Sequence, residues 1–285
     1  MAEPLIGVLA LQGAFEEHQK CLEAVGCRTV QVRTPMNLEG LDGIVLPGGE
    51  STAMGLIGTS SGKDSSGKTM WEALREFSRS KPTWGTCAGM ILLADKCVGT
   101  SAVIEDGQAL IGGIDITVCR NYFGSQVSSF EMETPSPPGM EQSGSFPGVF
   151  IRAPSILSAA PGVDILGKVV AIPCRSAAVT LMELERKISA GENVIKMGVV
   201  DALDRTAGID YVVVMKPADE SQKAEEEESS EEFNTISLPG AADGTNARQV
   251  ICAARKNNIL CTAFHPELTD DIRWHQYFVE MVRSS

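Results

Sequence analysis

The first part of the chain alternates short apolar runs with amphipathic segments. Leu5–Leu11 is apolar at nearly every position, which is typical of a strand buried on both faces of a parallel sheet. Phe15–Val25 carries apolar residues at helical spacing, and Gly26 follows as the expected helix end. Arg28–Val32 and Gly43–Leu46 are predicted strands. This β-α-β order predicts an open, mostly parallel central sheet with helices on both faces.

The middle of the chain is richer in strand patterns. Helices are predicted over Met70–Ser80 and Ala88–Asp95, and short β-prone runs closed by turn residues follow at Ile111–Val118, Gln126–Phe130 and Gly148–Ile151. Beyond these the pattern weakens, and the remaining signals are a strand at Val169–Ile172, a helix at Ala178–Ile188 and a strand at Ile209–Met215.

The last third contains an acidic stretch and then regular patterns again. Residues 217–246 are acidic, rich in Ser and Gly and poor in large apolar groups, so we expect disorder there. Gln249–Ala254 and Ile259–Phe264 predict a hairpin, and Asp270–Met281 predicts a final amphipathic helix.

The segment Gly58–Lys68 is a Ser/Gly/Lys stretch that we interpret as a surface loop. Its Gly-Lys pairs do not predict a phosphate-binding loop, because that motif also requires a buried strand directly before it.

Composition narrows the function classes. The formal net charge of −13 and the pI of about 4.8 argue against a nucleic-acid ligand. No apolar run reaches the roughly 18–20 residues of a membrane-spanning helix, so no membrane association is expected. Eight scattered cysteines and an apolar run that begins at Leu5 favour a reducing, cytoplasmic location without disulfides. We expect a single domain over residues 1–285.

Candidate chemistry centres on Trp84–Met90, where Cys87 lies between Gly85 and Gly89 at a predicted strand-to-helix corner. A nucleophile on such a turn requires little or no side chain two residues before and after it, since the chain folds back tightly there. The first turn of the following helix would direct unpaired N–H groups at the sulfur and favour the thiolate. Cys87 is therefore the candidate nucleophile, although a buried structural cysteine is the alternative.

The chain has three histidines, and His265 has the most suggestive context. It ends a predicted strand and precedes Pro266, which favours an extended backbone, so Glu267 is expected beside the His265 ring. Such a carboxylate would hold the imidazole while its other nitrogen takes the proton of Cys87. For His18 in the first helix and His275 in the last, we expect solvated or structural roles.

These residues resemble the class I, triad-type glutamine amidotransferases, whose fold is flavodoxin-like, and within them the glutaminase subunits of pyridoxal 5'-phosphate synthase. The resemblance rests on six motifs: Gly7–Gly13, Leu46–Thr52, Gly85–Gly89, Arg120–Gln126, Phe150–Pro154 and Phe264–Thr269. The Gly-x-Cys-x-Gly and His-Pro-Glu elements belong to the wider superfamily, whereas the Arg-Asn-x-Phe-Gly and Phe-Ile-Arg-Ala-Pro motifs indicate this subunit.

The resemblance implies a role for each site residue. Cys87, His265 and Glu267 would form the triad that hydrolyses L-glutamine through a glutamyl thioester, and the backbone of Gly48, Gly49 and Ala88 would meet the oxyanion. The glutamine pocket would be lined by Gly49, Glu50, Ser51, Arg120, Ile151 and Arg152. A carboxylate such as Glu50 suits an ammonium group and an arginine suits a carboxylate, but the sequence does not say which arginine.

The resemblance also implies that the subunit needs no cofactor or metal and passes ammonia to a (β/α)8-barrel synthase subunit. Gln12 and the acidic first helix would lie near that partner. Relative to the family, residues 174–248 resemble an insertion that is partly disordered and whose deletion over 218–242 should spare activity. Two alternatives stay open: the glutaminase subunit of a different amidotransferase, and a non-catalytic regulatory homologue.

Overall fold

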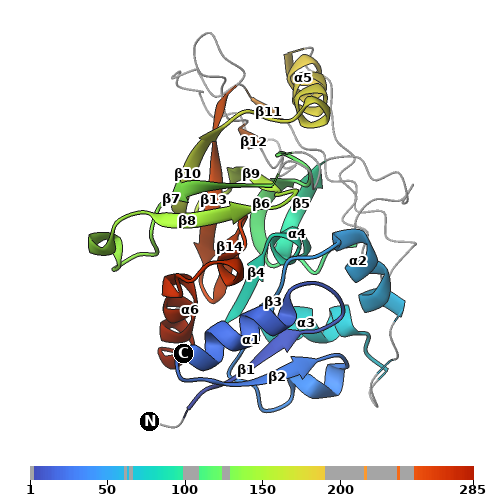
Figure 1. Cartoon of the computed structure of the whole chain (residues 1–285). Coiled ribbons are helices and arrows are strands. Elements are labelled where there is room, and N and C mark those ends of the chain that lie inside the picture. The colour runs from blue at the N-terminus through green and yellow to red at the C-terminus, as the bar shows by residue number, and fades with distance from the viewer. Residues whose placement is uncertain are drawn as a thin grey trace.

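The computed structural model describes residues 3–60, 63, 67–98, 109–123, 129–189, 215–216, 236–237 and 247–285. Its centre is one large sheet with the strand order β2-β1-β3-β4-β14-β13-β9-β6-β5, and β10 also pairs with β13 (Figure 1). The strands of this sheet are β1 (Leu5–Leu9), β2 (Arg28–Val32), β3 (Gly43–Leu46), β4 (Thr83–Thr86), β5 (Ala94–Val98), β6 (Ile114–Cys119), β9 (Ser155–Ala159), β10 (Asp164–Ala171), β13 (Arg248–Lys256) and β14 (Ile259–Thr262).

The half of the sheet from β2 to β14 is parallel throughout. Gly85 of β4 pairs with Leu46 of β3 on one side and with Cys261 of β14 on the other. Because these three strands end at nearly the same level, the loops that follow them meet at one edge. Sites in open α/β sheets form at this edge.

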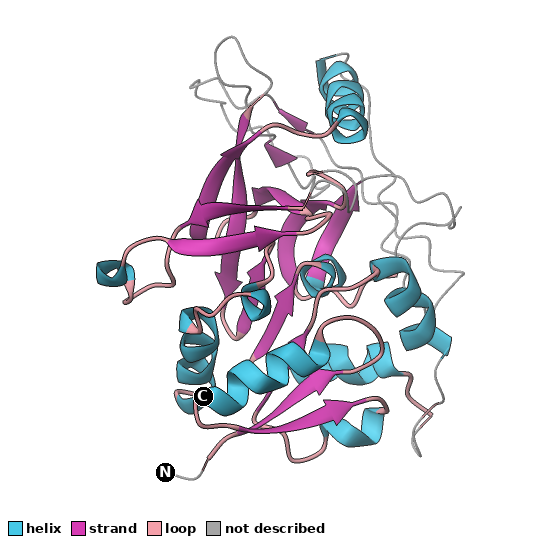
Figure 2. Ribbon diagram, viewed as in Figure 1, coloured by secondary structure: helices cyan, strands magenta, loops and turns pink. Residues whose placement is uncertain are grey.

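The other half is mixed, since β13 pairs antiparallel with β14, β9 and β10, and β6 pairs antiparallel with β9. A separate antiparallel ribbon of β7 (Phe130–Thr134) and β8 (Phe146–Phe150) crosses this half (Figure 2). A small parallel pair, β11 (Met215–Lys216) and β12 (Ile236–Ser237), also lies near it.

Helices cover the parallel half of the sheet. Helices α1 and α6 pack against each other, and α2 contacts both α3 and α4. The amphipathic patterns explain these positions: α1 buries His18 and Leu22, and α3 begins with a capping box between Thr69 and Glu72. The α-helices are α1 (Phe15–Ala24), α2 (Ser51–Ser60), α3 (Met70–Ser78), α4 (Ala88–Leu93), α5 (Arg175–Ser189) and α6 (Arg273–Arg283); the short 3₁₀ helices are η1 (Pro35–Leu38), η3 (Glu141–Ser143) and η4 (Pro266–Leu268).

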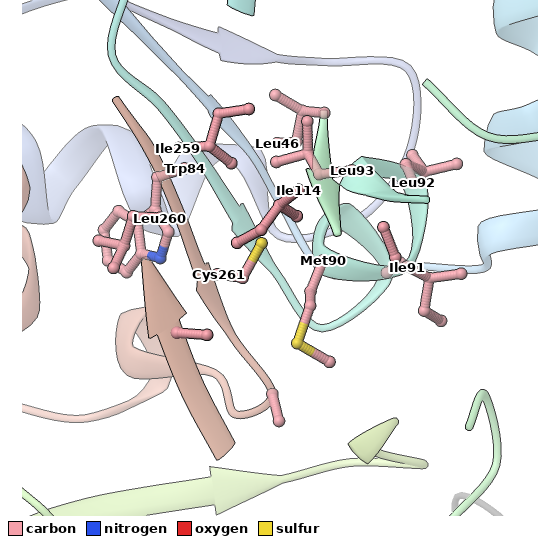
Figure 3. Close-up of a cluster of buried hydrophobic side chains, with 14 of the residues drawn as sticks. Leu46, Trp84, Met90, Ile91, Leu92, Leu93, Ile114, Ile259, Leu260 and Cys261 are labelled. Carbon is pink, nitrogen blue, oxygen red and sulfur yellow. The ribbon is translucent and has the colours of Figure 1, made fainter. Parts of the chain in front are cut away.

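The core beside the candidate site is packed around α4, which is buried along its whole length. Figure 3 shows Met90, Leu92 and Leu93 of this helix among side chains of β3, β4 and β14, including Leu46, Trp84 and Leu260. Each of these side chains is 0% exposed. A short helix without a polar face is stable here because packing, rather than intrinsic propensity, holds it.

Most predicted elements are confirmed to within a few residues, including the first three strands, the helices at 15–25 and 70–80, the hairpin and the last helix. Two predictions are wrong. The helix predicted over Ala88–Asp95 ends at Leu93, and its last residues begin β5, which pairs with β6. The loop predicted over Gly58–Lys68 begins later, because α2 continues to Ser60.

Some predictions fall outside the described residues. These are the run at residues 126–128, the strand at residues 209–214 and most of the acidic stretch 217–246. Strand β9 was not predicted at all.

Candidate active site

Cys87 occupies a sharp corner between β4 and α4. Its backbone has φ 48° and ψ −104°, a combination that costs a non-glycine residue conformational energy. Two backbone hydrogen bonds hold it, from Cys87 N–H to the carbonyl of Thr262 at 2.8 Å and from Ile91 N–H to the carbonyl of Cys87 at 3.2 Å. The corner is thus tied both to the next strand and to its own helix.

The crowding expected around this corner is confirmed. A Cβ atom at Gly85 would lie 2.5 Å from the carbonyl oxygen of Gly89, and one at Gly89 would lie 2.0 Å from the carbonyl oxygen of Leu46. Both neighbours are backbone atoms, which cannot move aside as a flexible side chain can. The sequence folds this way only with glycine at both positions.

His265 follows β14 and is fixed by its own backbone, since its N–H donates to the carbonyl of Val149 at 2.8 Å. Nδ1 of His265 lies 2.7 Å from Oε1 of Glu267, and both side chains are buried. The expected proximity of the two residues is therefore confirmed. The expected extended backbone is not, because Pro266–Leu268 forms a 3₁₀ turn.

Electrostatics in this buried group favour an imidazolium beside a carboxylate. Burial alone would lower the pKa of His265, but the negative charges of Cys87 and Glu267 outweigh it and raise that pKa well above 6.5. Burial would likewise raise the pKa of Glu267, but His18 and His265 hold it far below its ordinary value. Among the described residues, Nε2 of His265 has no hydrogen-bond partner, so this nitrogen is available to the sulfur.

A pocket of about 270 Å³ opens at this edge of the sheet. All but one of the candidate site residues predicted from the sequence line this pocket; the exception is Glu267, which contacts His265. The predicted residues that line it are Gly48, Gly49, Glu50, Ser51, Cys87, Ala88, Arg120, Ile151, Arg152 and His265. The structure thus brings together loops that follow β3, β4, β6, β8 and β14. This is a small concave site with convergent polar groups, as expected for a small polar ligand.

Arg120 lies on one wall of the pocket and is largely buried. Its NH2 group lies 3.0 Å from Oγ of Ser51, 2.8 Å from Oγ1 of Thr52 and 3.9 Å from Oε1 of Glu50. Its Nε has no hydrogen-bond partner among the described residues. Arg152, on another wall, has a positive φ of 48°.

Glu50 has a second structural task that its sequence context did not reveal. Its carboxylate accepts hydrogen bonds from the backbone N–H groups of Thr52 (3.1 Å) and Ala53 (2.7 Å) and so caps α2. Partial burial would raise its pKa, but these bonds and Arg120 lower it overall. The carboxylate is therefore ionised at neutral pH, and its side chain remains 47% exposed to the pocket.

The turn after β3, which contains Gly48 and Gly49, contributes backbone groups to the wall of the pocket. The carbonyl of Gly48 accepts a bond from Ala14 N–H at 3.4 Å, and Glu50 N–H donates to Oε1 of Gln12 at 2.6 Å. A Cβ at Gly48 would lie 2.1 Å from Cε1 of His265. Glycine therefore lets the turn approach the imidazole closely. Ala88, at the first position of α4, has a backbone N–H without an intrahelical partner.

Sequence reasoning missed several residues of the site. Gln12, assigned to a partner surface, lines the pocket, as do Asn121, Pro154 and Leu268. His18, expected to be solvated or merely structural, is fully buried and lies 3.2 Å from Glu267. The available signal was its spacing of four residues from Leu22, which places both on one face of α1.

The described residues contain no group of three or more His, Cys, Asp or Glu side chains arranged to hold a metal ion. They also contain no helix with the length and apolar character required to cross a membrane.

The fold and the corner cysteine, with the buried His-Glu pair beside it, define an α/β protein with a candidate thiol site at the edge of its sheet. The sequence profile of the SNO glutamine amidotransferase family matches residues 8–172 and 225–284, and the chain belongs to that family. Except for residue 173, the unmatched residues 173–224 fall inside the segment interpreted as an insertion, whereas residues 225–248 of that segment match the profile.

Relatives and a solved structure agree with this assignment. A probable pyridoxal 5'-phosphate synthase subunit PDX2 of Arabidopsis thaliana is 36% identical over 282 residues, covering 98% of this chain and 86% of the relative. The pyridoxal 5'-phosphate synthase subunit PdxT of Carboxydothermus hydrogenoformans is 34% identical, covering 97% of both chains. A crystal structure of a glutamine amidotransferase superposes with a TM-score of 0.60 at 28% identity, covering 98% of both chains.

Proposed function

We propose that this chain is the glutaminase subunit of a pyridoxal 5'-phosphate synthase, and that Cys87, His265 and Glu267 are its catalytic triad. The observation that carries the proposal is that a strained cysteine corner and His265, which is paired with the buried Glu267, line one pocket. Membership of the SNO family and the names of the relatives support the substrate and the pathway.

The geometry supports a two-step hydrolysis of L-glutamine. The Cys87 thiolate attacks the side-chain carboxamide carbon, and the imidazolium of His265 gives its proton to the departing nitrogen, so that ammonia leaves and a glutamyl thioester remains. The now neutral His265 takes a proton from water, which attacks the thioester. Glutamate leaves, and the sulfur returns to the thiolate while His265 is again protonated.

The remaining pocket residues have roles that fit their chemistry. The backbone N–H groups of Ala88 and of the Gly48-Gly49 turn stabilise the oxyanion. The ionised Glu50 suits the substrate ammonium, and Arg120 suits its carboxylate because its guanidinium is held in place by Ser51 and Thr52. Ile151 and Arg152 complete the wall.

The acceptor of the ammonia is a (β/α)8-barrel synthase subunit, and the glutaminase works in complex with it. The chain itself requires no cofactor for the hydrolysis, because the thiol, the imidazole and the carboxylate supply nucleophile, acid and base. A cytoplasmic location and an insertion within residues 174–248 of a single domain belong to the same proposal.

The test is glutamate release from glutamine by wild type and Cys87→Ala, with and without the synthase subunit. Wild type should release glutamate, and Cys87→Ala should lose turnover by several orders of magnitude, on the order of 10⁴-fold or more. Cys119→Ala, at a buried cysteine outside the pocket, is the matched control.

Equal turnover of wild type and Cys87→Ala in the complex would exclude Cys87 as nucleophile. A chain that hydrolyses glutamine only with another synthase would serve a different amidotransferase, and one with no turnover would be a regulatory homologue.

A further inference from the structure

A second imidazole contacts the carboxylate of Glu267 through its other oxygen. Nε2 of His18 lies 3.2 Å from Oε2 of Glu267, and both side chains are 0% exposed. Oε1 of the same carboxylate lies 2.7 Å from Nδ1 of His265. Glu267 therefore lies between two histidines, one from the last part of the chain and one from α1.

The ring of His18 is held on its other sides as well. Its Nε2 is also 3.2 Å from Oγ1 of Thr86, the residue before Cys87, and its Nδ1 is 3.0 Å from Nε2 of His275 in α6. The ring meets Trp84 edge-on, with 5.6 Å between ring centroids. Three elements, β4, α6 and η4, thus fix one side chain of α1.

The proton arrangement follows from these contacts. Glu267 is ionised and can only accept, so a bare lone pair on Nε2 of His18 would face a carboxylate and be repelled. Nε2 of His18 therefore carries a hydrogen, directed between Thr86 and Glu267. His275 adapts to either charge state of His18, because its Nε2 can donate to Nδ1 of His18 or accept from it.

A purely apolar packing role does not account for this contact. An ionised carboxylate that is removed from water is costly unless positive or donor groups surround it. Among the described residues, no donor other than Nε2 of His18, at 3.2 Å, contacts Oε2 of Glu267. A phenyl ring would fill the same space but leave this oxygen without a donor.

We propose that His18 is a positioning residue of the triad: its Nε2–H holds Oε2 of Glu267 and so keeps Oε1 against Nδ1 of His265. The inference rests on the proposed function, in which Glu267 orients His265 for Cys87. Without His18, the carboxylate is free to rotate about its last bond and to leave the imidazole without a fixed tautomer.

A matched pair of variants tests this proposal. The amide nitrogen of glutamine occupies the place of Nε2 of histidine and that of asparagine the place of Nδ1, so His18→Gln keeps the donor to Glu267 and His18→Asn keeps only the contact with His275. In the complex with the synthase subunit, His18→Asn should lower kcat for glutamine hydrolysis by about 10- to 100-fold with KM unchanged, and His18→Gln should stay within roughly threefold of wild type.

The same substitutions in a Glu267→Gln background show whether His18 acts through Glu267. If it does, His18→Asn causes no further loss of kcat there. Equal kcat for His18→Asn and wild type, equal losses for the Asn and Gln variants, or multiplying losses in the Glu267→Gln background would each overturn the proposal. A failure of both single variants to fold, seen by thermal unfolding, would do so too.

Cys87→Ala in the same assay separates this inference from the proposed function. If Cys87→Ala keeps the turnover of wild type, the proposed triad itself is refuted. If Cys87→Ala loses turnover while His18→Asn keeps the kcat of wild type, only the proposed role of His18 is refuted. Leu22→Ala, one turn further along the same buried face of α1, is the control for packing and should lower thermal stability while leaving kcat intact.

Discussion

Nδ1 of His265 and Oε1 of Glu267 are 2.7 Å apart across a single proline, and a 3₁₀ turn rather than an extended chain brings them together. Leu268 N–H closes the turn on the carbonyl of His265 at 3.3 Å. Pro266 fixes its own φ and excludes helical backbone for His265. The acid and the imidazole are therefore held by local geometry before any substrate binds.

Glu267→Gln should keep the fold and lose most of the activity. The glutamine amide occupies the same space, but it presents either a neutral oxygen or an N–H to Nδ1 of His265, which weakens or inverts the tautomer that Cys87 requires. By analogy with an acid-to-amide change in a serine triad, kcat should fall by roughly 10³- to 10⁴-fold. Steady-state glutamate release measures this. If Glu267→Gln folds normally and keeps a near-normal kcat, Glu267 has no role in catalysis.

The lowered pKa of Glu267 gives a pH dependence of stability with a definite sign. Its pKa is depressed from 4.5 in the folded chain, so its contribution is fully present above about pH 4.5 and is lost as pH falls toward the folded value. The difference in melting temperature between wild type and Glu267→Gln should therefore shrink as pH falls below about 4.5.

Thermal unfolding followed by circular dichroism across this range provides the measurement. Glu39→Gln is the control, because Glu39 is exposed at the surface and its replacement should change the melting temperature little at any pH. A wild-type advantage that grows as pH falls below about 4.5 would contradict the depressed pKa of Glu267.

The sequence predicted the parts of the site that depend on short spacing. Gly85 and Gly89 flank Cys87 at fixed distances, and His265 and Glu267 are separated by one proline, so local chain geometry determines both pairs. The β-α-β pattern was also enough to predict that the loops after β3 and β4 meet at one edge of a parallel sheet. The parallel pairing of β14 with β4, which adds His265 to this edge, was not predicted, because the sequence indicated only the hairpin of β14 with β13.

His18 was not predictable in the same way. Its contact with His275 joins residues 257 positions apart, and the charged neighbours Glu16, Glu17 and Lys20 give its surroundings a solvated look. The side chain is instead buried against Trp84, and this burial arises only when α1 packs on other elements of the fold, among them α6. Similarly, the residues of β5 follow a helix-compatible run, and their pairing with β6 overrides that preference.

Gly89→Ala should damage both stability and activity. The added Cβ would lie 2.0 Å from the carbonyl oxygen of Leu46, so α4 must move away from β3, at a cost of about 1–3 kcal/mol or more, and the corner at Cys87 moves with it. Gly40→Ala is the control: its Cβ meets nothing within 4 Å, and only its positive φ of 75° is unfavourable. Chemical denaturation and glutaminase assays should show that Gly40→Ala keeps kcat and Gly89→Ala does not. Wild-type kcat in Gly89→Ala would contradict the crowding argument.

Arg120→Lys should weaken glutamine binding without slowing the chemical step. The guanidinium is held by Ser51 and Thr52 on the pocket wall, and its planar fork suits the substrate carboxylate, which a lysine ammonium cannot match in two directions. Loss of a hydrogen bond to a charged group costs about 1.5–3 kcal/mol, so KM should rise by about 10- to 100-fold. Because the carboxylate is remote from the carboxamide that reacts, kcat should change little.

Arg152→Lys in the same assay decides which of the two arginines holds the substrate carboxylate. Arg273 pairs with Asp271 outside the pocket, so Arg273→Lys is the control and should leave KM unchanged. A larger rise in KM for Arg152→Lys than for Arg120→Lys would assign the carboxylate to Arg152.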